Sequence, residues 1–324
     1  MPLKSLSDKR KLYIIGNGFD RGHRLPCSYH DFYKYLKENR EDILEVMGKF
    51  YDVREKSQLW TDFESNLEKD IDYDEFTKQI IEHTPNIASD EFRDRDWYEA
   101  QFAIEIESEA LIKLLQEGFE EWIQSLNVSS SINKSYSLDT SAYFLTFNYT
   151  EVLESVYDIP SSNILHIHNK VGEDLIFGHG KNVEDFNVRK ALYGTENPFL
   201  SYDENGNIES TEDGHERFAE EAVCSFYNKM KKQTEKIIQR HSCFFEKLSD
   251  ISEVIVLGHS YNEIDEPYFK QITSAIPNTA KWTLCYYTDD DKTKAKKLMQ
   301  KLNVAQNLQE YKHSDDLKIK NNNE

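Results

Sequence analysis

Polar residues that could bind a ligand or move a proton follow several apolar runs of this sequence. The first run leads into a turn made of Gly16, Asn17, Gly18, Phe19 and Asp20. Glycine has no Cβ atom, so the chain can turn tightly there and come close to a ligand. Free amides in such a turn attract an anion such as a phosphate. The same glycines also fit a purely structural turn, so both interpretations stay open.

Three further features refine the chemistry of this turn. Asp20 could accept a hydrogen bond from a ribose hydroxyl or cap the next helix. We group His23 with the binding residues, although a structural role is common for such a histidine and its spacing from His30 does not resemble a compact metal site. Arg21 stands where a G-x-G-x-x-G turn has its last glycine, which disfavours an ordinary dehydrogenase.

The later apolar runs end in residues of similar chemistry. Asn148 follows one run, and His166 and His168 alternate with Ile167 in the next, so we expect the two histidines to share one side of a strand. The run at residues 254–258 leads into Gly258, His259, Ser260 and Asp265. Because ligands bind outside the carboxyl ends of parallel strands, we expect all these residues to line one pocket with the first turn.

Short runs of β-branched and aromatic residues predict the strands, at residues 12–15, 142–147, 164–168, 175–178, 254–258 and 282–287. Continuous apolar runs are typical of parallel strands that are buried on both faces. We therefore predict an α/β fold with a Rossmann-like, mainly parallel sheet and a large helical insertion after the first strand. The predicted parts are a nucleotide-binding core (9–36 and 139–313), a helical cap (37–138) and a flexible tail (314–324).

Within the predicted cap, residues 102–126 have the spacing of an amphipathic helix. Phe102, Ile106, Ala110 and Leu114 recur every four residues, and the stripe continues with Phe119, Trp122, Ile123 and Leu126. We expect this stripe to form the buried face of the helix.

Charge, cysteine content and hydropathy disfavour several classes of protein. The formal net charge of -20 repels phosphate backbones, which argues against general nucleic-acid binding. The four cysteines include no C-x-x-C pair, which argues against a disulfide framework or a cysteine zinc site. We find neither the apolar segment of a signal peptide nor a run of the ~20 apolar residues that a membrane span needs. We expect a cytoplasmic protein with no membrane partner.

Six segments, in order, resemble the AbiH-type bacteriophage abortive-infection proteins. They are YIIGNGFDRGHRLPCSYHDFYKYL, LWTDFESNLE, FLTFNYTEVLE, ILHIHN, FGHG and VIVLGHSYNEIDEPYF, and they span about residues 11–270. The resemblance implies a bacterial role in antiphage defence, in which cell death or growth arrest limits the spread of phage. It supplies no reaction by itself.

A more distant resemblance, to the sirtuin-like NAD-binding fold, implies a chemistry. Gly16-Asn17-Gly18 resembles the sirtuin G-A-G, and the later motifs N-x-D, L-H-G and glycine–serine resemble Asn148-Tyr149-Thr150, Ile167-His168-Asn169 and Gly258-His259-Ser260. Thr150 replaces an acid and Asn169 replaces a glycine. The four-cysteine zinc module of sirtuins has no counterpart here, which disfavours protein deacylation and leaves hydrolysis of NAD as the implied activity.

The sirtuin-like resemblance implies a role for each matching residue. Asn148 would hold the nicotinamide-side ribose and a water, and His168 would act as the base. His166 stays open as an alternative base, although only His168 matches the histidine of L-H-G. We expect the amides of Asn17, Gly18 and Phe19 to hold the diphosphate, and Asp20 or Asp265 to hold a ribose. NAD would be the substrate, and we expect no metal. A small nucleotide is the expected partner. A homo-oligomer, a phage-derived trigger and a neighbouring defence protein stay open as further partners.

Two other functions stay open. A nucleotide-binding sensor or scaffold of a defence system would bind its ligand without releasing nicotinamide. A metal-dependent nuclease effector would use His23, His30, Asp31, His166 and His168 as candidate ligands.

Overall fold

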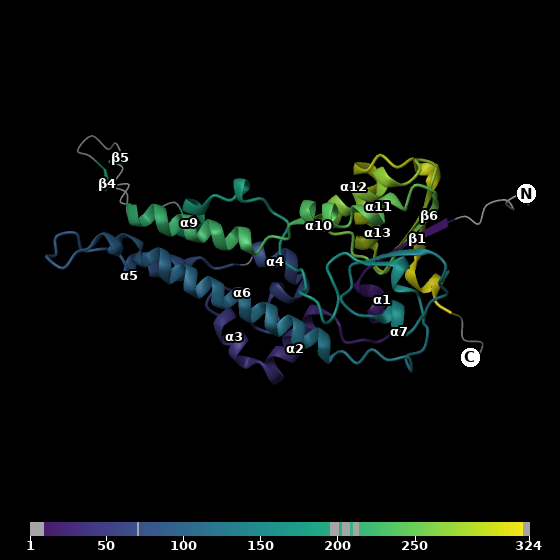
Figure 1. The fold of residues 1–324 in the computed structure, drawn as a ribbon, viewed down its shortest axis with the longest axis horizontal. Helices are drawn as coiled ribbons and strands as arrows, with labels where there is room; N and C mark the ends of the chain where they lie inside the picture. The colour runs from purple at the N-terminus through teal and green to yellow at the C-terminus, as the bar shows by residue number, and fades with distance from the viewer. Residues whose placement is uncertain (1–9, 70, 195–200, 203–207, 210–213, 320–324) are drawn as a thin grey trace, which may run out of the picture. The chain divides into compact units, whose positions relative to one another are not determined.

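The computed structural model describes residues 10–69, 71–194, 201–202, 208–209 and 214–319 (Figure 1). The chain divides into two compact units. The α/β unit comprises Met1–Phe32, Glu120–Ile176 and Gln233–Glu324, and the helical unit comprises Tyr33–Phe119 and Phe177–Lys232. Lys9, at the predicted start of the core, and residues 320–324 of the predicted tail lie outside the described residues.

The α/β unit is built on a six-stranded parallel sheet in the order β3-β2-β1-β6-β7-β8. The strands are β1 Arg10–Ile15, β2 Tyr143–Thr146, β3 Ile164–His166, β6 Ile251–Leu257, β7 Lys281–Tyr286 and β8 Gln309–His313. The chain moves outward from β1 to one edge and then from β6 to the other, as in dinucleotide-binding Rossmann folds. The predicted α/β fold with a Rossmann-like sheet is therefore confirmed.

Alternate residues of the strands face two separate cores. Leu12 and Ile14 of β1 belong to the core that also contains residues of α10, α11, α12 and α13. Tyr13 and Ile15 belong to the core that contains residues of α1 and α7 (Figure 1). These helices are α1 Asn17–Gly22, α7 Val152–Ser155, α10 Thr234–Arg240, α11 Ser242–Glu246, α12 Glu266–Ala275 and α13 Asp289–Lys301. Burial on both faces explains why most strands are continuously apolar.

The remaining helices fall wholly or partly in the helical unit. They are α2 Tyr29–Asn39, α3 Glu41–Met47, α4 Phe63–Lys69, α5 Asp74–Glu82, α6 Glu99–Ser125, α8 Val188–Tyr193 and α9 Gly214–Lys229. A two-stranded sheet pairs β4 Ser201–Tyr202 with β5 Ile208–Glu209. Single 3-10 turns occur at Gln58–Thr61, Asp94–Tyr98, Ser161–Asn163, Val183–Asp185, Glu263–Asp265, Gln306–Leu308 and Ser314–Leu317. None of the described helices has the length and apolar character that a membrane crossing requires.

The FGHG segment at residues 177–180 has a packing role within the helical unit. Gly178 adopts a φ of +142°, and a Cβ atom there would lie 2.3 Å from the carbonyl oxygen of Met230. The adjacent His179 is buried, and its Nε2 lies 2.9 Å from the carbonyl oxygen of Tyr227. Burial lowers the pKa of His179 to about 4, so this ring is neutral at physiological pH. This motif therefore serves the helical unit.

The units differ from the predicted domain boundaries in four places. Residues 33–36 and 177–232 group with the helical unit, and residues 120–138 group with the α/β unit. Part of the predicted tail is ordered, because Ser314–Leu317 forms a turn and the Ile319 N–H donates to the carbonyl oxygen of Ser135. The helical unit is therefore built from two separate stretches of the chain, whereas we predicted a single insertion.

The buried face of α6 matches the prediction only in the second half of the helix, where Phe119, Trp122 and Ile123 are buried. The side chains of Phe102 and Ile106 are 52% and 69% exposed, whereas Ile104 and Leu111 are fully buried. The helix carries apolar residues on two stripes at helical spacing, and the packed stripe is the one through Ile104. Periodicity alone does not distinguish two such stripes.

Candidate functional site

Two glycine turns pack backbone against backbone where β1 and β6 end. Gly258, directly after β6, has a φ of +72°, and a Cβ atom there would lie 2.2 Å from the Phe19 nitrogen. A Cβ atom on Gly16 would lie 2.6 Å from the Cα atom of His259. The Gly18 N–H donates to the Gly258 carbonyl oxygen at 2.8 Å. These glycines are needed because no side chain fits between the two turns.

This packing occupies two of the three backbone amides that we expected to hold a diphosphate. The Gly18 amide is used by Gly258, and the Phe19 N–H donates to the Gly16 carbonyl oxygen at 2.9 Å. Asn17 is exposed, and its side-chain amide donates to the Cys27 carbonyl oxygen. A ligand at this edge would therefore have to be recognised mainly by side chains.

Phe19 and His23 are packed into the core on the α1 side of the sheet. The Phe19 ring is fully buried, and it contacts the rings of His23, Tyr136 and Tyr157. The His23 Nδ1 lies 2.8 Å from the Phe19 carbonyl oxygen, and its Nε2 lies 2.8 Å from the Tyr157 hydroxyl. Burial lowers the pKa of His23, which favours the neutral ring. These contacts give Phe19 and His23 structural roles.

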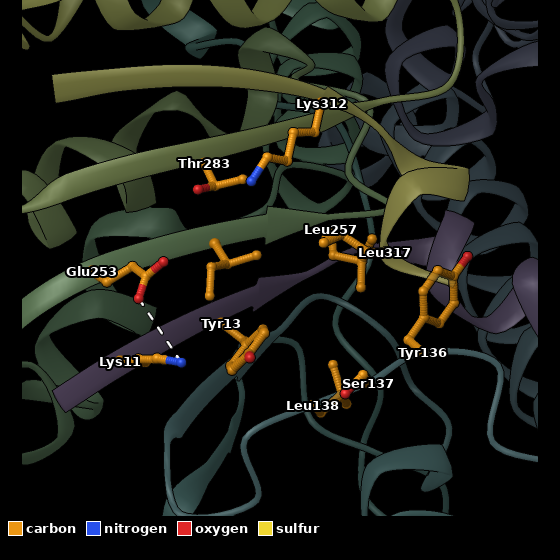
Figure 2. Close-up of a pocket in the computed structure, with 11 residues that line it drawn as sticks. Lys11, Tyr13, Tyr136, Ser137, Leu138, Glu253, Leu257, Thr283, Lys312 and Leu317 are labelled. Atoms are coloured by element: carbon orange, nitrogen blue, oxygen red, sulfur yellow. Dashed lines mark ion pairs between the residues drawn. The ribbon is translucent and has the colours of Figure 1, made fainter. Parts of the chain in front are cut away.

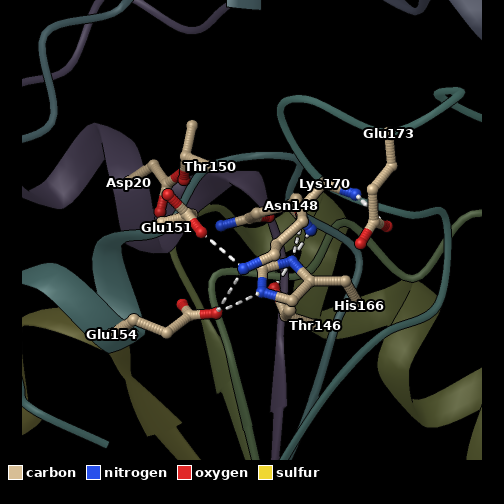
Figure 3. A network of polar contacts seen from close by, with 9 residues as sticks. All are labelled: Asp20, Thr146, Asn148, Thr150, Glu151, Glu154, His166, Lys170 and Glu173. Carbon is tan, nitrogen blue, oxygen red and sulfur yellow. Dashed lines mark hydrogen bonds and ion pairs between the residues drawn. The ribbon is translucent and has the colours of Figure 1, made fainter. Parts of the chain in front are cut away.

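Asp20 lies beside residues of the segment that follows β2 (Figure 3). Its carboxylate is almost fully buried, and its Oδ2 accepts a hydrogen bond from the Thr150 hydroxyl. Burial raises the pKa of Asp20 to about 6, although the Thr150 hydroxyl, the nearby Asn148 amide and the His166 ring oppose the rise. The Oδ1 atom is buried and has no hydrogen-bond partner in the described part of the chain.

Asn148 directs its side-chain amide toward Asp20 (Figure 3). Its backbone is fixed on both sides: the N–H donates to Thr146 Oγ1 at 3.0 Å, and the carbonyl oxygen lies 3.0 Å from His166 Nδ1. Asn148 as a whole residue is only 6% exposed. Neither Oδ1 nor Nδ2 of its side chain has a hydrogen-bond partner among the described residues. Asp20 and Asn148 thus face each other, close enough for the Asn148 amide to lower the pKa of Asp20, while Asp20 Oδ1 and both Asn148 side-chain polar atoms lack a hydrogen bond of good geometry. Such atoms are rare in folded proteins and point to a bound water or ligand group.

His166 and Glu154 form a polar network around Asn148. The sequence predicted His166 only as a candidate base or metal ligand and did not predict a role for Glu154. The Glu154 carboxylate lies 3.0 Å from His166 Nε2 and 3.6 Å from the Lys170 ammonium, which also pairs with Glu151 (Figure 3). Burial raises the pKa of Glu154, but the His166 hydrogen bond and charge and the Lys170 charge outweigh it, so the net pKa is lowered. The sequence did contain a signal for Glu154. In the NYTEVLE segment, Glu151 and Glu154 follow Asn148 closely, where a helix begins.

His168 belongs to a different group of contacts. Its Nε2 lies 3.2 Å from the Tyr268 hydroxyl, and its ring packs against Phe147 at 5.4 Å between ring centroids. The two histidines therefore do not share one environment, because β3 ends at His166 and the alternation ends with it. Phe147 also packs against His259, with ring centroids 4.6 Å apart.

His259 holds the turn after β6 in place. Its Nδ1 accepts a hydrogen bond from the Tyr261 N–H at 2.8 Å, so its Nε2 carries the hydrogen that faces Asp265 Oδ2 at 3.2 Å. Asp265 is buried by this pairing, whereas Ser260 is exposed. The structure thus brings Asp20 and Asn148 together, and both His168 and His259 pack against Phe147.

A separate pocket of about 190 Å³ lies against the sheet face that carries Tyr13 and Ile255 (Figure 2). Its ionic side chains are already paired: Lys11 lies 3.9 Å from Glu253, and Lys312 lies 3.1 Å from Glu310. This pocket therefore offers fewer unsatisfied polar groups to a ligand than the cluster of Asp20 and Asn148.

The candidate metal ligands have separate partners. Asp31 accepts a hydrogen bond from the Ser28 N–H, His23 contacts Tyr157, His166 contacts Glu154 and His168 contacts Tyr268. Across the described residues, no three His, Cys, Asp or Glu side chains are grouped so that they could hold a metal ion.

A family model described as bacteriophage abortive infection AbiH matches residues 12–286. The chain belongs to the AbiH family. This membership gives the protein a role in bacteriophage abortive infection. Searches of curated proteins and of solved structures found no match. The AbiH match includes most of β1, all of β2, β3, β6 and β7, and the residues Asp20, Asn148, Glu154, His166 and His168.

Proposed function

We propose that this AbiH protein binds NAD at the carboxyl ends of β1, β2 and β3 and hydrolyses its nicotinamide–ribose bond. The observation that supports this proposal is the pair of buried, unsatisfied side chains of Asp20 and Asn148. An unpaired buried polar group costs about 1–3 kcal/mol, so a ligand that supplies hydrogen bonds there gains affinity. A ribose offers hydroxyl donors to Asp20 and acceptors to the Asn148 amide.

The strand order places this pair where Rossmann folds bind ligands. Asp20 follows β1 and Asn148 follows β2, at the carboxyl edge of the sheet and next to the reversal in strand order between β1 and β6. Because the amides of Gly18 and Phe19 are occupied, recognition at the ribose carries more of the binding than recognition at the diphosphate.

The reaction adds water to the ribose carbon as the bond to the pyridinium nitrogen breaks. Nicotinamide leaves as a neutral molecule, and the water loses one proton. Asn148 orients the ribose and the water, and the Asp20 carboxylate stabilises the positive charge that develops on the sugar. His168, whose Nε2 lies 3.2 Å from the Tyr268 hydroxyl, is the residue we assign to accept this proton.

The test is to incubate purified protein with NAD and to measure free nicotinamide and ADP-ribose by chromatography. Asn148→Ala and His168→Ala are each expected to lower nicotinamide release by about 10²–10⁴-fold, the range for loss of a positioned catalytic group. His313→Gln is the control, because His313 lies at the end of β8. Release that persists in both variants would reject this assignment of residues, and no release from the wild type would reject the reaction.

A nucleotide sensor without turnover is the second candidate. The observation that favours it concerns Thr150. This residue replaces the acid of the sirtuin-like motif, and its hydroxyl donates a hydrogen bond to Asp20. Calorimetry with NAD and with related nucleotides separates the two candidates. A sensor binds one of these nucleotides tightly and releases no nicotinamide, whereas an enzyme consumes it.

A further inference from the structure

We propose that His166 and Glu154 are positioning residues that set the direction of the Asn148 side chain. This inference rests on the proposed function, because it assigns the groups that hold a residue of that site. His166 donates from Nδ1 to the Asn148 carbonyl oxygen at 3.0 Å, and Glu154 holds Nε2 of the same ring at 3.0 Å. The ring thereby links α7 to the segment after β2.

The backbone of Asn148 needs such support. It lies directly beyond the last ladder pairs of β2, so the parallel sheet no longer fixes its carbonyl group. The Thr146 hydroxyl accepts its N–H, and His166 Nδ1 faces its carbonyl oxygen. With both backbone groups held, the side-chain amide stays directed at Asp20 although neither of its polar atoms is bonded.

Glu154 gives the ring its orientation. Its carboxylate lies 3.0 Å from the ring nitrogen and is itself neutralised by Lys170 at 3.6 Å. The side chains of His166 and Glu154 are only 9% and 16% exposed, so water competes little for these hydrogen bonds. The ring therefore lies between the Asn148 carbonyl oxygen and the Glu154 carboxylate, a place that suits it to hold the Asn148 backbone.

Two substitutions of His166 separate its two hydrogen bonds. In His166→Asn the amide nitrogen takes the place of Nδ1, so the bond to the Asn148 carbonyl is kept and the bond to Glu154 is lost. In His166→Gln the amide nitrogen takes the place of Nε2, so the bond to Glu154 is kept and the Asn148 carbonyl is released. His313→Gln is the matched control, because His313 also lies between a backbone carbonyl (Tyr287) and a carboxylate (Asp315).

We expect kcat to fall in the variant that loses the hydrogen bond to the Asn148 carbonyl oxygen, and to be largely kept in the variant that retains it. His166→Gln should lower kcat for nicotinamide release by about 100-fold with KM changed less than about threefold, as expected for a misdirected catalytic group. His166→Asn should retain kcat within about tenfold, and His313→Gln should match the wild type. If His166→Gln does not fold, Glu154→Ala is the second variant, with an expected tenfold loss in kcat. Equal kcat values for His166→Gln and His166→Asn would overturn the proposal, as would an unchanged Glu154→Ala.

Hydrogen exchange keeps this inference separate from the proposed function. If the wild type releases no nicotinamide, the reaction is rejected, and exchange of the peptide amides in residues 146–152 then decides the positioning role. Faster exchange in His166→Gln, with His166→Asn and His313→Gln like the wild type, would support it. Exchange at one rate in all four proteins would contradict it.

Discussion

At the scale of single residues, the buried carboxylate of Asp20 couples the site to stability. Its pKa is raised from 3.8 to about 6 chiefly by burial, so the folded protein holds this proton more tightly than the unfolded chain. Below about pH 4 both states are protonated and stability is unaffected. As pH rises toward 6 the folded state loses stability, and above 6 the whole penalty is present.

Asp20→Asn should therefore stabilise the protein at neutral pH. We expect the free energy of unfolding at pH 7.5 to rise by about 1–3 kcal/mol, because the neutral amide avoids the cost of a buried charge and can still accept from Thr150. Urea unfolding followed by circular dichroism at pH 4, 5, 6 and 7.5 measures this, and the two proteins should converge at pH 4. The same variant should lose nicotinamide release.

Asp139→Asn is the control for this measurement. A hydrogen bond from Ser141 lowers the pKa of Asp139, so its contribution to stability is present at neutral pH and is lost as pH falls below its ordinary value. Its amide variant should be less stable than the wild type at pH 7.5, opposite in sign to Asp20→Asn. A destabilised Asp20→Asn protein at pH 7.5 would show that Asp20 is a structural acid and not a strained site residue.

Sequence reasoning reached the site residues with distinctive chemistry and missed the residues that hold them. Asp20 and Asn148 were found because polar residues after apolar strands are unusual. The roles of Glu154 and Tyr268 depend on which side chains α7 and α12 bring to the strand ends, and neither residue is unusual in its own helix. Their partners are set by tertiary packing, which spacing along the chain does not encode.

At the scale of elements, the contact between the two glycine turns is the tightest in the site. Gly258→Ala should prevent normal folding, because the new Cβ atom would lie 2.2 Å from the Phe19 nitrogen in addition to the strain of a φ of +72°. Gly172→Ala is the matched control, since its φ is +86° and nothing lies within 4 Å of the added atom. It should cost only about 1–2 kcal/mol. Melting temperatures of the two variants test this, and similar values would show that the turns can move apart.

The buried face of α6 can be tested in the same paired way. Ile104→Ala should lower the free energy of unfolding by about 2–5 kcal/mol, because Ile104 is fully buried. Ile106→Ala, two residues later, should change it by less than about 0.5 kcal/mol, because that side chain is 69% exposed. Chemical unfolding of both variants distinguishes the faces. A larger loss for Ile106→Ala would restore the face that periodicity predicted.

The elements that were predicted correctly are those with strong local patterns. β1, β6 and β7 are apolar because both of their faces are covered, and the sequence shows this directly. β8 was not predicted because its sequence, QEYKH, is polar. It is an edge strand that pairs only with β7, and edge strands often carry polar residues. Residues 175–178 are apolar but form no strand in the structure. Apolar character reports burial, and burial is not confined to sheets.

At the scale of the whole molecule, the net charge of -20 acts against folding through repulsion between like charges. Raising NaCl from about 20 to about 300 mM shortens the screening distance from roughly 20 Å to below 10 Å. The melting temperature should therefore rise by a few degrees. A melting temperature that falls with salt would mean that surface ion pairs, such as that of Lys301 with Glu266, contribute more than the repulsion.

The order of the strands along the chain also sets when the site can exist. β1 ends at Ile15, but its neighbour β6 begins only at Ile251, and Gly258 follows it. Ribosomes add about 5–20 residues per second, so roughly 10–50 s separate the synthesis of these two strands. During that interval the nascent chain has Asp20 but not the turn against which Gly16 and Gly18 pack. An abortive-infection protein assembled in this way cannot form its complete site until the ribosome has passed Gly258.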